Sequence, residues 1–135
     1  MVDFLPLHRQ SPNTSVKDHL AAKMSEVSQL VIPREPVYLD PKYWILLRDV
    51  TMGRPRSSVH TKLLDEFRRS VRAGTHVSPI GESVFLELLF QSDWTSRQAM
   101  ARLIDELSLG VTIQNTQDRL RTELSDFIVR TTKEQ

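Results

Sequence analysis

Apolar residues recur along this chain in patterns that predict helices separated by short strands. Four segments place apolar residues three and four positions apart, as helices with one buried face do. These segments span about residues 15–31, 58–73, 94–109 and 116–130. Two more segments, about residues 41–51 and 83–91, are apolar on most sides and are expected to form largely buried helices.

Short apolar segments between these helices predict β-strands. Residues 37–39, 76–80 and 111–113 contain β-branched or aromatic residues and are bounded by proline or turn residues. The order strand, two helices, strand, two helices, strand, helix is typical of an α/β domain with a parallel sheet. Right-handed crossovers would place the three strands side by side. The predicted fold class is α/β, with three layers in which helices flank a short parallel sheet of about three strands.

Composition narrows the class of protein. The 135 residues carry a formal net charge of +1, which gives no electrostatic case for a dedicated nucleic-acid coat. Cysteine is absent, so disulfides, thiol catalysis and cysteine-ligated zinc are excluded. No apolar run approaches the roughly 20 residues of a membrane span. The first 15 residues have no apolar core preceded by basic residues, so we expect no signal peptide and a cytoplasmic protein.

Asp40 lies where the first predicted strand meets the next helix, and Pro41 follows it. A lone Asp at such a junction is more often a helix N-cap than a catalytic residue. Ligands of open parallel sheets, however, bind beyond the carboxyl ends of the strands. Both interpretations of Asp40 stay open from the sequence.

Glu87 is the one carboxylate within the apolar run Val84 to Phe90. At helical spacing it shares a polar line with Ser83 and Gln91. A carboxylate on so apolar a helix must find water, a cation or a hydrogen-bond donor, because burying it alone is costly. It is therefore either an exposed residue on a wet face or a metal ligand in a cleft.

Arg97 lies in the first turn of its predicted helix, where a cation opposes the helix dipole by a few tenths of a kcal/mol. That position favours a specific partner for Arg97, such as a carboxylate.

The order and spacing of several short motifs resemble the first half of a PIN-like domain. The motifs are Leu39-Asp40-Pro41-Lys42-Tyr43-Trp44, Ser78-Pro79-Ile80 followed by Glu87-Leu88, then Arg97 and Leu107-Ser108-Leu109-Gly110. The first is similar to bacterial PIN-like proteins whose first strand ends in Leu-Asp-x-x-x-Trp. The resemblance covers about residues 36–114, so we expect an N-terminal arm and helix over 1–35, a partial PIN-like domain over 36–130 and a polar tail over 131–135.

This resemblance implies an activity and a site. PIN domains are metal-dependent ribonucleases, and many are toxins of toxin–antitoxin pairs. Asp40 would match the first acidic ligand of the family and Glu87 the second, and both would be catalytic. Arg97 would orient a ligand carboxylate or contact phosphate. Mg²⁺ and Mn²⁺ suit such a site, because they prefer carboxylate oxygens and let water complete the shell.

The chain departs from the family pattern in its acidic residues. The third acidic ligand of the family, and often a fourth, come from a fourth strand and its helix, which have no counterpart here. Asp118, Glu123 and Asp126 lie on the last predicted helix and are more simply surface charges. Either the sequence is a truncated gene product, or a partner chain supplies the missing strands.

Two other interpretations therefore stay open beside the nuclease. One is a non-catalytic protein-interaction module, or a degenerate half-domain, that needs a partner chain or forms a homo-oligomer. The other is a plain, mostly helical domain in which the three predicted strands are loops.

Overall fold

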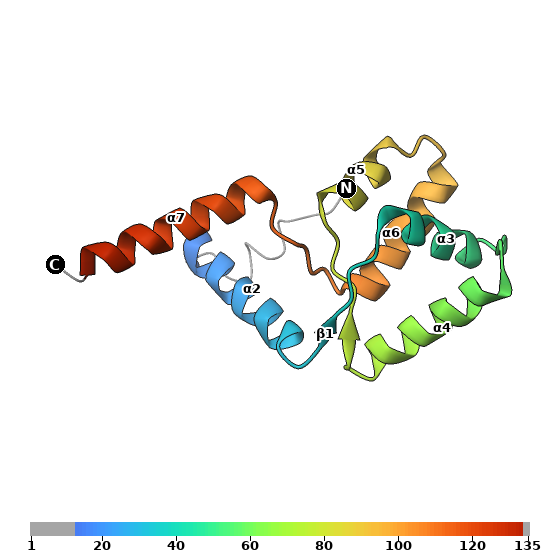
Figure 1. Ribbon diagram of the computed structural model, residues 1–135, viewed down its shortest axis with the longest axis horizontal. Coiled ribbons are helices and arrows are strands. Elements are labelled where there is room, and N and C mark those ends of the chain that lie inside the picture. The colour runs from blue at the N-terminus through green and yellow to red at the C-terminus, as the bar shows by residue number, and fades with distance from the viewer. Residues whose placement is uncertain (1–12, 134–135) are drawn as a thin grey trace. The chain divides into compact units, whose positions relative to one another are not determined.

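The computed structural model of this chain describes residues 13–133 (Figure 1). The chain divides into two compact units between Pro33 and Arg34, two residues before the predicted boundary at residue 35. Most of the predicted N-terminal arm and the last two residues of the predicted tail lie outside the described residues. The two units are considered separately.

The first unit contains the helix α2 (Val16–Val31), within one residue of its predicted range. The Ser15 hydroxyl oxygen accepts a 3.1 Å hydrogen bond from the backbone N–H of Asp18 and donates to the Asp18 carboxylate at 2.7 Å. This arrangement explains why the helix begins at this serine. None of the side chains on α2 is buried among the described residues, and Val16 is 77% exposed.

The second unit contains a parallel sheet of two short strands, β1 (Glu35–Pro36) and β2 (His76–Val77). The prediction of a first strand at residues 37–39 is wrong, since β1 lies just before that range. The N–H groups of Glu35 and Val37 donate to carbonyls of the β2 segment at 2.8 and 2.9 Å, and this pairing sets its position. Pro36 has no N–H to donate, and its position between these two donors leaves the pairing intact.

The third predicted strand is reduced to a single bridge. Ile80 and Thr112 form one isolated parallel bridge, and the N–H of Ile113 donates to the carbonyl of Ile80 at 2.8 Å. The three segments run in parallel as predicted, but the described residues form a two-stranded sheet rather than a three-stranded one. The fold is thus mostly helical, with a short parallel sheet flanked by helices.

Five helices belong to the second unit (Figure 1). They are α3 (Pro41–Thr51), α4 (Ser58–Arg72), α5 (Glu82–Phe90), α6 (Trp94–Ser108) and α7 (Thr116–Lys133). The positive φ angles of Gly74 and Gly110, 75° and 79°, follow the ends of α4 and α6 and explain why glycine stops these helices. The last helix includes the first three residues of the predicted polar tail, 131–133.

The core of the second unit lies where α3 contacts α4 and α6. Trp44 and Leu47 are fully buried on α3, as are Leu64 on α4 and Leu107 on α6. The remaining core residues are Leu39, Val71, Ile80, Val84, Met100, Leu103 and Ile104. This packing fixes the start of α3 and the start of α5 relative to the strands that precede them. None of the described helices is both long and apolar enough to cross a membrane.

Candidate functional site

Asp40 is the N-cap of α3. Its backbone is extended (φ −60°, ψ 148°), and its Oδ1 accepts a 2.9 Å hydrogen bond from the backbone N–H of Lys42. The capping interpretation is therefore confirmed. The side chain is exposed, and Oδ2 accepts no hydrogen bond from any described residue. One carboxylate oxygen thus remains available to a ligand.

Glu87 lies in the middle of α5 and is half-buried. Its carboxylate forms no ion pair or hydrogen bond with the other described residues. Ser83, one helical turn earlier, and Gln91, one turn later, continue the predicted polar line. Val84, the buried residue of α5, lies three positions before Glu87, so Glu87 lies next to the buried side of the helix.

Tyr38 links the segment that carries Asp40 to the helix that carries Glu87. Its hydroxyl lies 3.4 Å from the Ser83 hydroxyl, at the start of α5. Gly81, which precedes α5, lies against the same tyrosine, because a Cβ there would be in ordinary contact with the Tyr38 ring at 3.5 Å. Tyr38 and Ser83 therefore meet just beyond the carboxyl ends of the parallel β-strands.

Few side chains near Asp40 or Glu87 could act as metal ligands. Among residues 13–133, no three His, Cys, Asp or Glu side chains lie close enough to form a metal cluster. Magnesium is commonly held by one or two carboxylates, with water or phosphate completing its octahedron. Asp40 and Glu87 fit that donor chemistry, although they would not make a protein cage.

Arg97 finds its partner in the main chain rather than in a carboxylate. Its Nε donates to the carbonyl of Gln91 at 2.8 Å, and its Nη2 donates to the carbonyls of Gln91 and Leu89. These carbonyls belong to the end of α5, where a helix has unsatisfied acceptors and a partial negative charge. Arg97 thus holds the C-terminal end of the helix that carries Glu87.

The acidic residues of α7 are surface groups, as predicted. Glu123 pairs with Arg119 at 3.1 Å, and Asp126 is exposed. Asp118 lies 3.9 Å from Arg121 and lines an open groove of about 460 Å³ together with Glu82. None of these contacts joins an acid of α7 to Asp40 or Glu87.

The arginines of α4 are largely neutralised by neighbouring acids. Arg68 forms two hydrogen bonds with Glu106, at 2.8 and 3.1 Å, and Arg72 lies 3.9 Å from the same carboxylate. Arg69 pairs with Glu66 on its own helix. These residues tie α4 to α6, and they form no unpaired basic surface of the kind that non-specific RNA binding uses.

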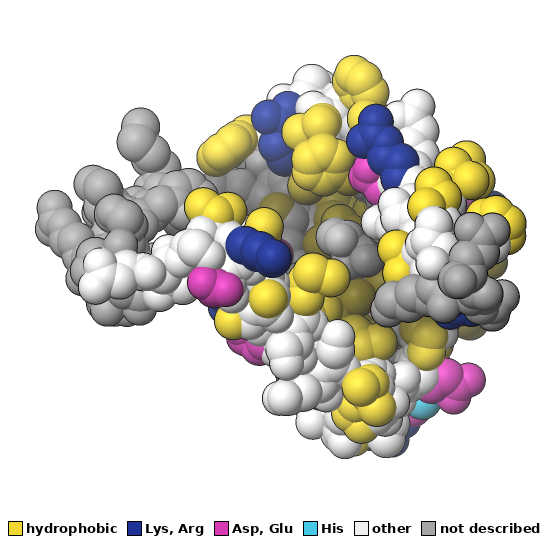
Figure 2. All heavy atoms as spheres, turned by 90° about the vertical axis from the view of Figure 1, so that its left-hand side faces the viewer, with side chains coloured by type: hydrophobic (Ala, Val, Ile, Leu, Met, Phe, Trp, Pro, Cys, Tyr) yellow, Lys and Arg dark blue, Asp and Glu magenta, His cyan; other side chains and the backbone are white. Residues whose placement is uncertain are grey.

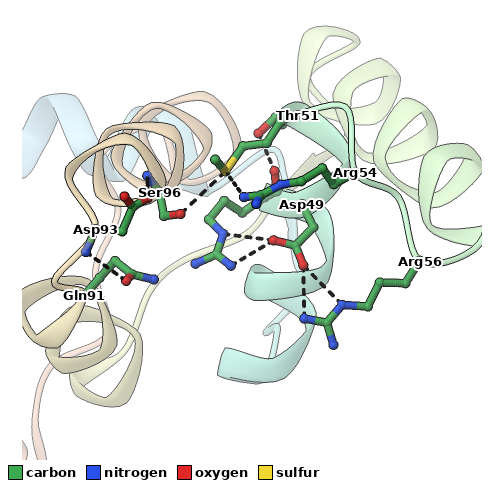
Figure 3. Close-up of polar contacts among 9 residues, drawn as sticks. Asp49, Thr51, Arg54, Arg56, Gln91, Asp93 and Ser96 are labelled. Atoms are coloured by element: carbon green, nitrogen blue, oxygen red, sulfur yellow. Dashed lines mark hydrogen bonds and ion pairs between the residues drawn. The ribbon is translucent and has the colours of Figure 1, made fainter.

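A buried charge cluster at the end of α3 was not predicted. Asp49 accepts hydrogen bonds from Arg48 at 2.8 Å and pairs with Arg56 at 3.1 Å (Figure 3). The side chains of Arg48 and Asp49 are each 10% exposed. The sequence signal was present, since an Arg-Asp pair interrupts a helix that is otherwise apolar on most sides.

Charge and hydrogen bonding set the ionisation of this cluster. Burial alone would raise the pKa of Asp49, but the hydrogen bonds and charges of Arg48 and Arg56 outweigh it and lower the pKa. Asp93 caps α6 and accepts a 2.7 Å hydrogen bond from the N–H of Ser96 (Figure 3). Hydrogen bonds from Ser96 also lower the pKa of Asp93. The carboxylates of Asp49 and Asp93 are therefore both ionised at neutral pH.

The second unit is mostly helical, and Asp40 and Glu87 lie on two different segments that follow its parallel strands. In comparisons with protein-family models, curated proteins and solved structures, nothing matches this chain.

Proposed function

We propose that this chain is a PIN-like domain related to metal-dependent endoribonucleases, with Asp40 and Glu87 as ligands of Mg²⁺ or Mn²⁺. The observation that carries the proposal is the contact between Tyr38 and Ser83. Alternate residues of an extended segment point to the same side, and residues four apart on a helix share a face. The contact therefore supports a common side for the carboxylates of Asp40 and Glu87.

Three residues would have separate roles in this site. The uncapped oxygen of Asp40 and the carboxylate of Glu87 would bind the cation, and Arg97 would keep α5 in position. Two carboxylates leave most of the coordination shell to water and to the phosphate of an RNA substrate. A cation bound there supplies activated water and neutralises charge on the phosphate during phosphodiester hydrolysis. A cytoplasmic location and a protein antitoxin belong to the same proposal.

Calorimetric titration with Mn²⁺ tests the metal site directly. We expect binding by the unaltered chain and at least a ten-fold loss of affinity in Asp40→Asn and Glu87→Gln. Asn caps a helix as well as Asp does, so Asp40→Asn should remove charge without unfolding α3. Asp105→Asn, on the exposed side of α6, is the matched control and should bind Mn²⁺ normally.

Cleavage of labelled RNA tests the reaction. Activity should require Mn²⁺ or Mg²⁺, disappear in Asp40→Asn and survive in Asp105→Asn. Equal titration curves for all four proteins, or RNA cleavage that is unchanged by Asp40→Asn, would show that Asp40 and Glu87 do not form a nuclease site.

A second candidate function is a non-catalytic protein-interaction module. It is favoured by the apolar side chains that α5 and the start of α6 leave exposed. Figure 2 shows hydrophobic side chains at several places on one face of the molecule. Phe85, Leu89, Phe90 and Trp94 are 49%, 53%, 80% and 64% exposed. Clustered exposed apolar residues commonly mark protein interfaces. This function predicts no Mn²⁺ binding and a particle heavier than 15.6 kDa in light scattering.

A further inference from the structure

The helix α7 presents an apolar stripe that no other described element of the second unit covers. Leu120, Leu124, Phe127 and Ile128 lie at spacings of four, three and one, which places them on one face. They are 51%, 60%, 65% and 57% exposed. Helices depend on the packing of such a face for most of their stability. Covering the stripe would therefore stabilise α7.

We propose that the stripe of α7 packs antiparallel against the same stripe of a second copy of this chain. The proposal does not depend on the metal site. Leu120 and Phe127 occupy d positions of a heptad, and Leu124 and Thr131 occupy a positions. Each a residue would then pack against a d residue of the other copy, which gives four layers with Leu124 and Phe127 at the centre.

The charges beside the stripe select this orientation. Glu123 and Arg130 occupy successive g positions on one flank. In an antiparallel pair g positions face g positions, so Glu123 meets Arg130 of the partner subunit, and two-fold symmetry repeats the ion pair. In a parallel pair Glu123 would instead face Ile128 of the partner subunit, and no ion pair would form.

Local contacts leave these two side chains able to pair. Glu123 Oε1 forms an ion pair with Arg119 Nε at 3.1 Å. A carboxylate has two oxygens, so Glu123 can accept a hydrogen bond from a second donor. Arg130 forms no ion pair with another described residue. An interface of four layers is small, so we expect dimerisation that depends on protein concentration.

Sedimentation equilibrium of the full chain tests the surface. The unaltered protein should approach twice its 15.6 kDa mass as its concentration rises. Leu124→Asp should remain monomeric at the same concentrations. Val129→Asp is the matched control, because Val129 is 48% exposed on the opposite face of α7 and receives the same charge change. Neither position belongs to the core, so urea unfolding followed by the fluorescence of the buried Trp44 should show a folded second unit in both variants.

Charge reversal tests the orientation. Glu123→Arg and Arg130→Glu should each weaken dimerisation by about ten-fold. Each variant places two side chains of the same charge opposite one another, and the two-fold symmetry repeats this repulsion. The double variant, Glu123→Arg with Arg130→Glu, should restore the original affinity. A monomer at every concentration, a dimer indifferent to Leu124→Asp, or a double variant as weak as the single ones would overturn the proposal.

Discussion

Asp49 is held by two arginines from different segments, Arg48 on α3 and Arg56 in the loop before α4. Replacing Asp49 with Asn would keep its shape but remove the charge that both guanidinium groups bind. We expect Asp49→Asn to lower the free energy of unfolding by about 2 kcal/mol, the scale of a hydrogen bond to a charged group. Urea unfolding at neutral pH measures this loss, and Asp105→Asn should show none.

The same carboxylate should make stability depend on pH. The pKa of Asp49 is lower in the folded chain than its usual 3.8, so the unfolded chain binds a proton first as pH falls. Its stabilising contribution is therefore complete above about pH 5 and is lost as pH falls through 3.8 towards the lowered folded value. Thermal unfolding should show that the unaltered chain is more stable than Asp49→Asn at pH 6 and that this difference in stability shrinks towards pH 3. A constant difference across that range would contradict this assignment.

Asp40 has two separable roles, a cap that is observed and a ligand that is proposed. Asp40→Ala should cost about 1 kcal/mol, because the N–H of Lys42 loses its acceptor, whereas Asp40→Asn should cost almost nothing. Both variants should lose Mn²⁺ binding. Chemical unfolding alongside the metal titration separates the roles. Normal metal binding by Asp40→Ala would leave Asp40 as a cap alone.

At the scale of the helix, Arg97 should stabilise the end of α5. Its guanidinium supplies hydrogen bonds that the last carbonyls of α5 would otherwise lack. We expect Arg97→Ala to cost about 1–2 kcal/mol and to speed amide hydrogen exchange in α5. Hydrogen exchange read by mass spectrometry checks this, with the exposed Arg102→Ala on α6 as the control. Equal exchange in the two variants would show that α5 does not depend on Arg97.

The helices could be predicted from sequence because their ends are set locally. Ser15, Asp40 and Asp93 each accept a backbone N–H at the start of a helix, and such caps depend only on neighbouring residues. The strands were harder to place. The register of β1 depends on carbonyls about 40 residues away, so the apolar run at 37–39 indicated a strand without fixing its limits.

The candidate site could be predicted in part. The sequence singled out Asp40, Glu87 and Arg97, and it gave the N-cap as the more common role for Asp40. It could not supply the carbonyl partners of Arg97, because they depend on how α6 follows α5 in space. The ion pair between Asp49 and Arg56 could not be predicted either, since Arg56 meets Asp49 only after the turn between α3 and α4 is formed.

Across the whole molecule, periodicity identified apolar faces but not their partners. The stripe of α6 enters the core, with Met100, Leu103 and Leu107 buried. Equally regular stripes on α2 and α7 stay at the surface of the described chain. A helical pattern reports that a face is apolar, whereas burial depends on which other elements reach it. This difference explains why the pattern at residues 15–31 predicted a helix with an apolar face but not the surface that covers it.

The division of the chain into two units predicts that the second folds without the first. The side chains of α2 are not buried within the described chain, and the core residues all lie after Pro33. A protein that begins at Arg34 should therefore keep the free energy of unfolding within about 1 kcal/mol of the full chain, the scale of surface changes. Urea unfolding followed by the fluorescence of the buried Trp44 measures this stability. A much less stable protein would show that residues 1–33 contribute to the core, and the two units would then fold as one.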